Sequence, residues 1–255
     1  MTAPGVDFRL FRDIDGVPLC PSGSVVCIGA FDGLHLGHRA LIEAARAAGL
    51  RSCKRRVGQG CGSRRRPYHS QGAKPPRLVL PRTKIDGLAR LGADVVGLLR
   101  FNAAMTRMTP EQFVARAVMA RLAAREVWVG RDFRFGHGRA GDVGALRTMG
   151  ARAGFSVHAI EDVTINGERV SSSRIRQALV AGELDHAARL LGRRYAIDGR
   201  VVRGAQLGRQ LGYPTANLRF GGKTPALSGI YATFVHGVGA TPCACVSTPG
   251  TPPTA

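Results

Sequence analysis

Two histidines three residues apart, His35 and His38, lie where an apolar run meets a helical pattern. The sequence from Gly29 to His38 is GAFDGLHLGH, and it joins the apolar run at residues 24–28 to the helical pattern at 38–48. Glycine lets the backbone approach a phosphate closely, and a helix N-terminus offers free N–H groups and partial positive charge. Imidazoles there can hydrogen-bond the oxygens of a transferring phosphate group. The turn therefore predicts a nucleoside triphosphate site rather than a loop with incidental polar side chains.

A zinc site is the alternative use of the two histidines, and the sequence favours it less. Neither an H-E-x-x-H helix nor a C-x-x-C pair is present, and no third ligand lies nearby in the sequence. The cysteines, at positions 20, 27, 53, 61, 243 and 245, show no metal-ligand spacing. Because Cys27 lies inside a predicted core strand, we expect reduced thiols rather than a disulfide framework.

The composition is that of a globular protein. Hydrophobic residues make up 44% of 255 residues, which is enough to build a buried core in one large domain or two smaller ones. No run of eighteen apolar residues occurs, and no apolar signal core follows the N-terminus. We therefore expect a cytoplasmic protein with no membrane partner, and the oligomeric state stays open.

The net charge of +20 is concentrated in one part of the chain. Residues 44–85 contain twelve Lys or Arg and no Asp or Glu. An arginine-rich arm binds phosphate backbones nonspecifically and in a salt-dependent way, but here no aromatic residues are interleaved to stack on bases. We therefore expect no specific nucleic-acid partner.

The basic stretch includes residues 51–74, where all periodicity is lost. This segment holds a single Val, four Gly and eight basic residues, a composition that cannot bury enough surface to order itself. We therefore expect it to be disordered, although it stands where a second parallel strand should follow the first helix. Its abrupt start and the regular pattern that returns at Pro75 raise the hypothesis of a shifted reading frame.

Strand and helix patterns alternate along the rest of the first 190 residues. This alternation predicts an α/β fold with an open, Rossmann-like parallel sheet covered by helices on both faces, and ligands bind such sheets at the carboxyl ends of the strands. Strands are expected at residues 24–28, 94–100, 126–130 and 155–160, and helices at 38–48, 83–91, 110–124, 144–154, 172–181 and 185–191. Thr109 is the expected N-cap of the third helix, with Pro110 at its first position.

A second domain is predicted to begin near residue 190, which gives domains 1–190 and 191–255. Residues 195–202 alternate with period two, closely spaced Gly and Pro turns follow, and 230–235 form another short strand pattern. This is typical of the start of a small antiparallel β-barrel. The prolines in the final stretch, residues 243–255, do not suit a barrel strand.

Three further clusters carry side chains suited to phosphate or metal chemistry. Asp132 follows a predicted strand within VGRDFRFGHG, at the same edge of the sheet as the histidine turn; an aspartate that only caps a turn is the less favoured alternative. Residues 170–176, VSSSRIR, open a helix; the serines could serve only as caps, but arginines beside a helix N-terminus also clamp a polyphosphate. Residues 208–217, GRQLGYPTAN, form a rigid turn whose Thr and Asn oxygens suit Mg²⁺.

Together these motifs resemble the bacterial bifunctional riboflavin kinase/FMN adenylyltransferase (FAD synthetase) family, over roughly residues 23–50 and 75–235. The shared patterns are F-D-G-x-H-x-G-H, G-x-D-F-x-F-G, S-S-x-x-I-R and G-x-P-T-A-N, in the family's order. The resemblance implies an N-terminal domain that transfers AMP from ATP to FMN, giving FAD and pyrophosphate. It also implies a C-terminal barrel that phosphorylates riboflavin to FMN, with Mg²⁺ accompanying ATP.

The resemblance also implies roles for individual residues. His35 and His38 would stabilise the α-phosphate of ATP as catalytic residues, and Asp132 and Phe133 would lie in the flavin pocket. Thr215 and Asn217 would bind the Mg²⁺–nucleotide of the kinase, with Gly208 and Arg209 in its phosphate loop. The implied ATP-binding residues are Gly29, Phe31, Asp32, Gly33, Gly37, Ser172, Ser173, Arg174 and Arg176.

The sequence departs from the family pattern in three places. Ala30 stands where the family has Asn, and residues 51–74 replace a hydrophobic strand. Residues 246–255 only faintly resemble a family strand. The family pattern places the glutamate that acts as catalytic base beyond residue 255, so we expect this base and the remaining barrel strands to be missing. We therefore expect riboflavin kinase activity to be lost.

Three other interpretations stay open at this point. The chain could be an inactive remnant that binds nucleotide or flavin at most, or a cytidylyltransferase-like relative, which the GYPTAN turn at 212–217 disfavours. A basic RNA-binding protein is the last alternative.

Overall fold

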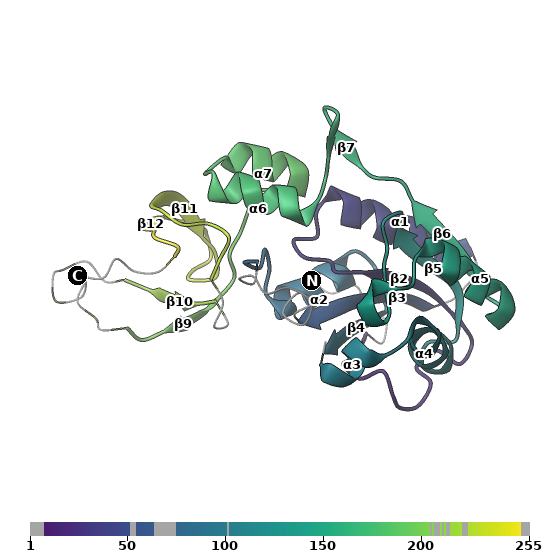
Figure 1. The fold of residues 1–255 in the computed structure, drawn as a ribbon. Coiled ribbons are helices and arrows are strands. Elements are labelled where there is room, and N and C mark those ends of the chain that lie inside the picture. Colours follow the sequence, from purple (N-terminus) through teal and green to yellow (C-terminus); the bar gives the residue numbers. More distant parts are fainter. Residues whose placement is uncertain are drawn as a thin grey trace. The chain divides into compact units, whose positions relative to one another are not determined.

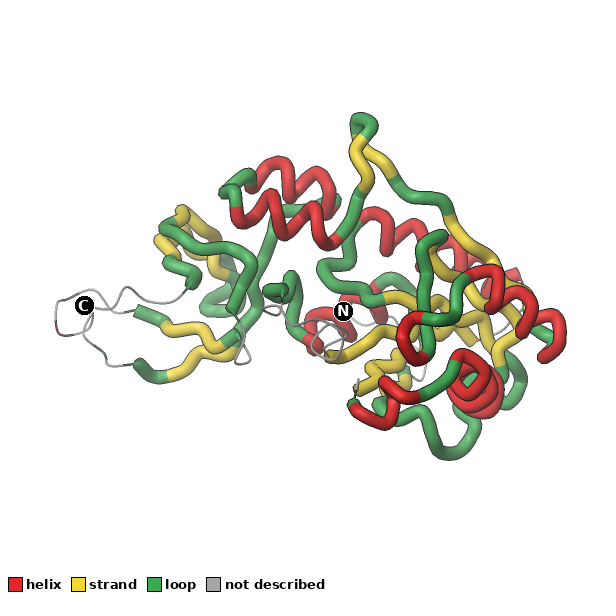
Figure 2. Tube along the Cα trace, viewed as in Figure 1, coloured by secondary structure: helices red, strands yellow, loops and turns green. Residues whose placement is uncertain are grey.

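The computed structural model describes residues 8–51, 55–63, 75–100, 102–204, 206, 210, 212, 215–220 and 224–250. The chain forms two compact units, Met1–Lys74 with Pro81–Ser171 and Pro75–Leu80 with Ser172–Ala255. Figures 1 and 2 show their helices and strands. The predicted domain boundary at residue 190 stays a prediction. Within the described residues, no helix combines the length and the apolar character needed to cross a membrane.

The first unit is built on a six-stranded sheet in which all paired neighbours are parallel, in the order β1-β4-β3-β2-β5-β6. This confirms the predicted open parallel sheet of the α/β class. The strands are β1 (Arg9–Phe11), β2 (Ser24–Gly29), β3 (Arg55–Ser63), β4 (Val95–Arg100), β5 (Ala124–Gly130) and β6 (Ser156–Ile160). The short edge strand β1 was not predicted.

Two hydrophobic clusters cover the two faces of this sheet. Alternate side chains of β2 point to opposite faces: Val25 and Cys27 join one cluster, Val26 and Ile28 the other. Helices α1 (Leu36–Arg51) and α2 (Pro81–Arg90) contribute to the first cluster. The π-helix η1 (Val114–Arg121) and helix α5 (Val143–Ala153) contribute to the second. Burial on both faces explains why β2 is an uninterrupted apolar run.

Strand β3 corrects the expectation that residues 51–74 are disordered. Arg55–Ser63 forms a central strand that pairs in parallel with β2 and β4, so the expectation is wrong over these residues. Val57 and Gly58 are buried, and a Cβ on Gly58 would lie only 3.5 Å from side-chain atoms of Leu88 and Ala93. The side chains of β3 carry no hydrophobic pattern that would predict a strand. The strand can still form, because pairing with two neighbours supplies backbone hydrogen bonds that do not depend on side chains. Residues 52–54 and 64–74 lie outside the described residues, and the reading-frame hypothesis stays a hypothesis.

The helix predicted at residues 110–124 begins where the sequence indicates. Thr109 caps α4 (Pro110–Phe113) by accepting from the Gln112 backbone N–H at 3.2 Å, and the Gln112 side chain accepts from the Thr109 N–H at 3.0 Å. This is a complete capping box, with Pro110 in the first turn. The π-helix η1 follows directly, and β5 starts at Ala124, two residues earlier than predicted. The short helices α3 (Ala103–Arg107) and η2 (His137–Arg139) were not predicted.

A hairpin closes the first unit. Strands β7 (Thr164–Ile165) and β8 (Glu168–Arg169) are antiparallel, and the two residues between them, Asn166 and Gly167, both have positive φ. Two such residues favour a tight turn that matches strand twist.

The second unit contains helices α6 (Ser172–Val180) and α7 (Leu184–Leu191), followed by two antiparallel strand pairs. Strand β9 (Arg200–Val202) pairs with β10 (Asn217–Arg219), and β11 (Tyr231–Val235) with β12 (Cys243–Ser247). The expectation that residues 243–255 do not suit a strand is therefore wrong for β12. The reason is that Pro249 falls beyond the end of β12, where its carbonyl accepts from the Gly229 N–H at 3.3 Å.

Cysteines 20 and 27 are buried free thiols, and cysteines 243 and 245 are exposed free thiols. This confirms the expectation of reduced thiols for these four. Burial raises the pKa of the Cys27 thiol to about 12, which makes it an inert core residue.

Candidate functional site

The turn between β2 and α1 holds the two histidines at the start of a 16-residue helix. The His35 carbonyl accepts from the Arg39 N–H at 3.0 Å, so His35 ends the turn and His38 lies in the first helical turn. Phe31 and Leu34, both buried, have φ of 49° and 47°, the left-handed region that side chains rarely adopt. Burial of these two apolar side chains against the core fixes the path of the turn.

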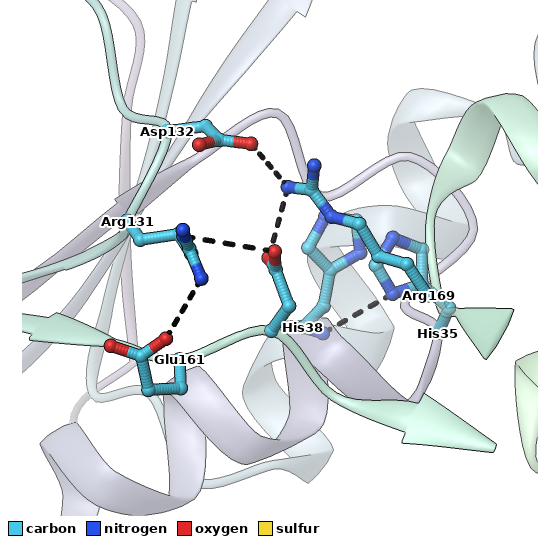
Figure 3. A network of polar contacts seen from close by, with 7 residues as sticks. His35, His38, Arg131, Asp132, Glu161 and Arg169 are labelled. Atoms are coloured by element: carbon cyan, nitrogen blue, oxygen red, sulfur yellow. Dashed lines mark hydrogen bonds and ion pairs between the residues drawn. The ribbon is translucent and has the colours of Figure 1, made fainter. Parts of the chain in front are cut away.

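The two imidazoles are stacked on each other. Their centroids are 3.6 Å apart with the planes 19° from parallel, and the His38 backbone N–H donates to His35 Nδ1 at 3.3 Å (Figure 3). Because that nitrogen accepts, the proton of a neutral His35 lies on Nε2. Gly37 allows the close packing, since a Cβ there would lie 3.3 Å from the His35 ring. The edge of Phe31 meets His38 at 5.3 Å between centroids.

His38 is held neutral. Burial, the neighbouring His35 and the charge of Lys84 together lower the pKa of His38 well below its usual value. His38 Nδ1 is buried with no hydrogen-bond partner among the described residues. An incoming anion would interact favourably with this helix N-terminus and would favour a proton on the neutral His38 imidazole.

Lys84 is the functional candidate that sequence reasoning missed. It lies on α2, its side chain is only 4% exposed, and its Nζ donates to the Ala30 carbonyl at 2.7 Å. A signal was present in the sequence: Lys84 occupies the apolar face of the predicted helix, one turn before Leu88. A lysine at a core-facing position is rarely buried without a partner.

The direction of the strand connections reverses next to this turn. The connection from β2 through α1 leads to β3 on one side, whereas that from β5 through α5 leads to β6 on the other. β2 and β5 are neighbours, and the carboxyl ends of two such diverging parallel strands form the usual ligand crevice of open α/β sheets. The histidine turn follows β2, and Arg131 and Asp132 follow β5.

A network of ion pairs surrounds Asp132 at the same edge of the sheet. Arg169 of β8 contacts Asp132 at 2.6 Å and Asp162 at 2.9 Å, and Arg131 contacts Glu161 at 3.1 Å (Figure 3). The Arg131, Asp132 and Arg169 side chains are about half exposed, so their ion pairs contribute little stability. Their effect is to hold charged groups in fixed positions around Asp132. The Asp132 side chain therefore does more than cap a turn, since it pairs with Arg169.

A cavity of about 480 Å³ lies beside this network, and Asp132 and Phe133 both line it. Its wall also includes Arg131, Arg134 and Arg139. Phe133 stacks on Phe135 with 5.4 Å between ring centroids. Aromatic and guanidinium groups in one wall suit a flat ligand that carries phosphate.

The remaining nucleotide-site candidates divide between the two units. Gly33 has φ of 93°, so the turn requires glycine there, and the half-buried Asp32 precedes it. Ser172, Ser173, Arg174 and Arg176 lie in the first two turns of α6, in the second unit. Within that unit the Arg176 Nε donates to the Pro76 carbonyl at 2.7 Å.

The kinase-half candidates are described in part. Thr215 is exposed, and Asn217 begins β10 with its side chain packed over Gly204, where a Cβ would overlap it. One hydroxyl and one amide oxygen are hard ligands that fit Mg²⁺, which keeps several waters. Gly208 and Arg209 lie outside the described residues. No cluster of three or more His, Cys, Asp or Glu side chains suited to a metal occurs in the described part of the chain.

Comparisons with known proteins point to the same family for the N-terminal and the C-terminal part of the chain. The family model described as FAD synthetase matches residues 18–174, and that described as riboflavin kinase matches residues 191–255. A bifunctional riboflavin kinase/FMN adenylyltransferase of Escherichia coli K12 is 36% identical over 247 residues, covering 96% of this chain and 79% of the relative. A protein of the same description from Pseudomonas fluorescens is 38% identical over 217 residues, covering 84% and 68%.

A solved structure described as a macrolide-efflux protein from Streptococcus pneumoniae has the same fold. It superposes with a TM-score of 0.79 at 26% identity, covering 95% of this chain and 79% of its own.

Proposed function

Because this chain belongs to the family of bacterial bifunctional riboflavin kinase/FMN adenylyltransferases, which are transferases, we propose that it transfers AMP from ATP to FMN. A phosphate oxygen of FMN attacks the α-phosphorus of ATP, and the bond from that phosphorus to the bridging oxygen of the β-phosphate breaks. FAD and pyrophosphate leave. The observation that carries the proposal is the stacked His35–His38 pair, with His38 neutral, at the N-terminus of α1 and the carboxyl end of a central strand.

The proposed chemistry needs positioning and charge stabilisation, with no covalent intermediate. His35 and His38 donate hydrogen bonds to the α-phosphate oxygens, where negative charge develops. The charge of the bound triphosphate raises the pKa of His38 again, so this imidazole can take up a proton as ATP binds. Backbone N–H groups of the turn that contains Gly29, Phe31, Asp32, Gly33 and Gly37 hold the nucleotide.

The outgoing phosphates and the flavin have separate proposed partners. Ser172, Ser173, Arg174 and Arg176 hold the pyrophosphate, supported by their place in the first turns of α6. Asp132 and Phe133 bind FMN, supported by the cavity that they share. Mg²⁺ supplies charge neutralisation on the nucleotide phosphates when bound, and Thr215 and Asn217 would hold the ion of the kinase half.

The alternative of an inactive remnant stays open. Two features favour it, a missing strand after α1 and the departures of the barrel half from the family pattern. β3 removes the first of these, because it fills that place in the sheet.

The test is to incubate the purified chain with FMN, ATP and Mg²⁺ and to measure FAD and pyrophosphate. We expect FAD formation in the wild type and a loss of about 10²–10³-fold in kcat for His38→Ala, because one hydrogen-bond donor to the transition state is removed. His158→Gln, which changes an exposed histidine elsewhere in the same unit, is the matched control and keeps wild-type turnover. No FAD from folded wild-type protein, or equal rates in His38→Ala, would contradict the proposal.

Riboflavin phosphorylation is the second activity named for the relatives, and residues 191–255 match the corresponding family model. The sequence-based expectation that this activity is lost stays a prediction. It is checked by measuring FMN formed from riboflavin and ATP, and turnover would show the expectation to be wrong.

A further inference from the structure

We propose that Lys84, a residue outside every motif of the family resemblance, is a positioning residue for AMP transfer: its buried ammonium holds the β2–α1 turn in shape and places a positive charge beside the histidine pair. This inference rests on the proposed function.

An ammonium is costly to bury. Lys84 is 4% exposed and lies on α2, whose neighbouring position Leu88 is fully buried in the core. Removing such a charge from water costs several kcal/mol unless the surroundings compensate. The 2.7 Å bond to the Ala30 carbonyl is part of that compensation. A charge retained at a position where Leu or Met would pack at less cost indicates a role other than stability.

The turn that Lys84 contacts has a conformation that needs support. Phe31 and Leu34 both have left-handed φ values without being glycine, a backbone conformation that is unfavourable for residues with a side chain. The Lys84 bond fixes the peptide plane between Ala30 and Phe31, at the first of these residues. Gly87, one helical turn after Lys84, lies against Leu34, because a Cβ on Gly87 would overlap the Leu34 side chain. One face of α2 therefore holds both ends of the turn that leads into His35.

Lys84 also acts through its charge. The titratable groups that influence His38 are His35, from the turn, and Lys84, from α2. Both disfavour a proton on His38, so they lower its pKa in the free protein. A fixed cation beside two imidazoles also attracts the anionic phosphates that the site is proposed to bind. No hydrogen bond from the Ala30 side chain can supply this support, since alanine replaces the asparagine of the family pattern.

The experiment uses three substitutions at one position. Lys84→Met removes both the hydrogen bond and the charge, Lys84→Gln can still donate to the Ala30 carbonyl but is neutral, and Lys84→Arg keeps the charge. Arg82→Met is the matched control, because it removes an exposed positive charge from the same helix. FAD formation is followed across pH to obtain kcat and kcat/KM for each variant.

We expect Lys84→Met to lower kcat by about 10- to 100-fold, as a misplaced catalytic group does. The histidine limb of its kcat/KM profile should move to higher pH, because a cation that opposes protonation of His38 is gone. A purely structural role would lower activity without moving that limb. Lys84→Arg should recover part of the rate, and Arg82→Met should match the wild type. Wild-type kcat and an unmoved limb in folded Lys84→Met would overturn the proposal.

A second variant and a second measurement distinguish failure of the Lys84 proposal from misfolding and from failure of the proposed function. If Lys84→Met fails to fold, Lys84→Gln decides: wild-type kcat and an unmoved limb in that variant overturn the role of charge. NMR titration of the histidine ring protons reports the pKa of His38 without turnover. A wild type that makes no FAD refutes the proposed function, and an upward shift of the His38 titration in the variant then still supports the placement of the charge. Active wild type with no shift in either measurement refutes the role of Lys84 alone.

Discussion

Two features of the fold both favour the neutral form of the His38 imidazole. It is packed against His35 and Phe31, which favours the neutral form, and it lies at a helix N-terminus, which also disfavours a proton. The free protein therefore keeps His38 uncharged, and an anionic ligand reverses this preference. Such a residue is matched to a ligand that brings its own negative charge.

The lowered pKa of His38 gives a pH-dependent term in stability. In the unfolded chain the histidine titrates near 6.5, whereas in the folded protein its pKa is well below that value. As the pH falls below 6.5, the unfolded state binds a proton that the folded state does not, so the free energy of unfolding decreases. The contribution of one group approaches about 1.4 kcal/mol per pH unit.

We therefore expect His38→Gln to lose less stability than the wild type between pH 6.5 and pH 5. Urea denaturation at several pH values measures the difference, and titrating groups that do not interact with His38 cancel in the comparison. Parallel curves for the two proteins would contradict the assignment.

At the scale of single elements, the capping box at α4 makes a measurable contribution. Thr109→Ala removes the side-chain oxygen that accepts from the Gln112 N–H, and we expect a loss of about 1 kcal/mol in the free energy of unfolding. Thr148→Ala is the control, because Thr148 lies inside α5 and its hydroxyl donates to the Gly144 carbonyl at 3.2 Å rather than capping a helix end. Its change should stay within about 0.5 kcal/mol. Equal losses in the two variants, measured by urea denaturation, would argue against a capping role.

Elements whose side chains carry the signal could be predicted from the sequence. The apolar runs of β2 and β4, the capped start of α4 and the glycine stop of α5 are all where the pattern indicated. β3 could not be predicted, because its position is set by backbone pairing on both sides rather than by its own side chains. The π-helical geometry of η1 has no counterpart in hydrophobic periodicity.

The candidate site likewise contains features that the sequence predicts and features that depend on the folded arrangement. The spacing of His35 and His38 indicates their proximity, because three residues span nearly one helical turn. The pairing of Arg169 with Asp132 joins residues 37 positions apart and depends on the arrangement of β5 and the β7–β8 hairpin. Lys84 was overlooked because the periodicity of α2 predicts a helix but says nothing about what its buried face contacts.

At the scale of the whole molecule, β3 is expected to be necessary for folding of the first unit. Val57 is 2% exposed and belongs to the core cluster that also contains Val26 and Val95. Val57→Asp places an unpaired carboxylate at the centre of the sheet, which costs more than the usual reserve of about 5–15 kcal/mol can tolerate when packing is lost as well.

The expected outcome is loss of cooperative unfolding and of near-ultraviolet circular dichroism in Val57→Asp. Val17→Asp is the matched control, since Val17 is 76% exposed in the same unit, and it should behave as the wild type. A folded Val57→Asp protein would mean that residues 55–63 are dispensable for the sheet.

The pairing of β2 with β5 has a consequence for how the protein is made. Ser24 lies opposite Ala124, so one hundred residues separate the two partners, the largest separation among the described strand pairs. At about 5–20 residues per second, a ribosome needs roughly 5–20 s to deliver β5 after β2. During that time one edge of an apolar strand stays open to other chains. The strand that leads into the histidine turn therefore has the longest wait for a partner among the described strand pairs.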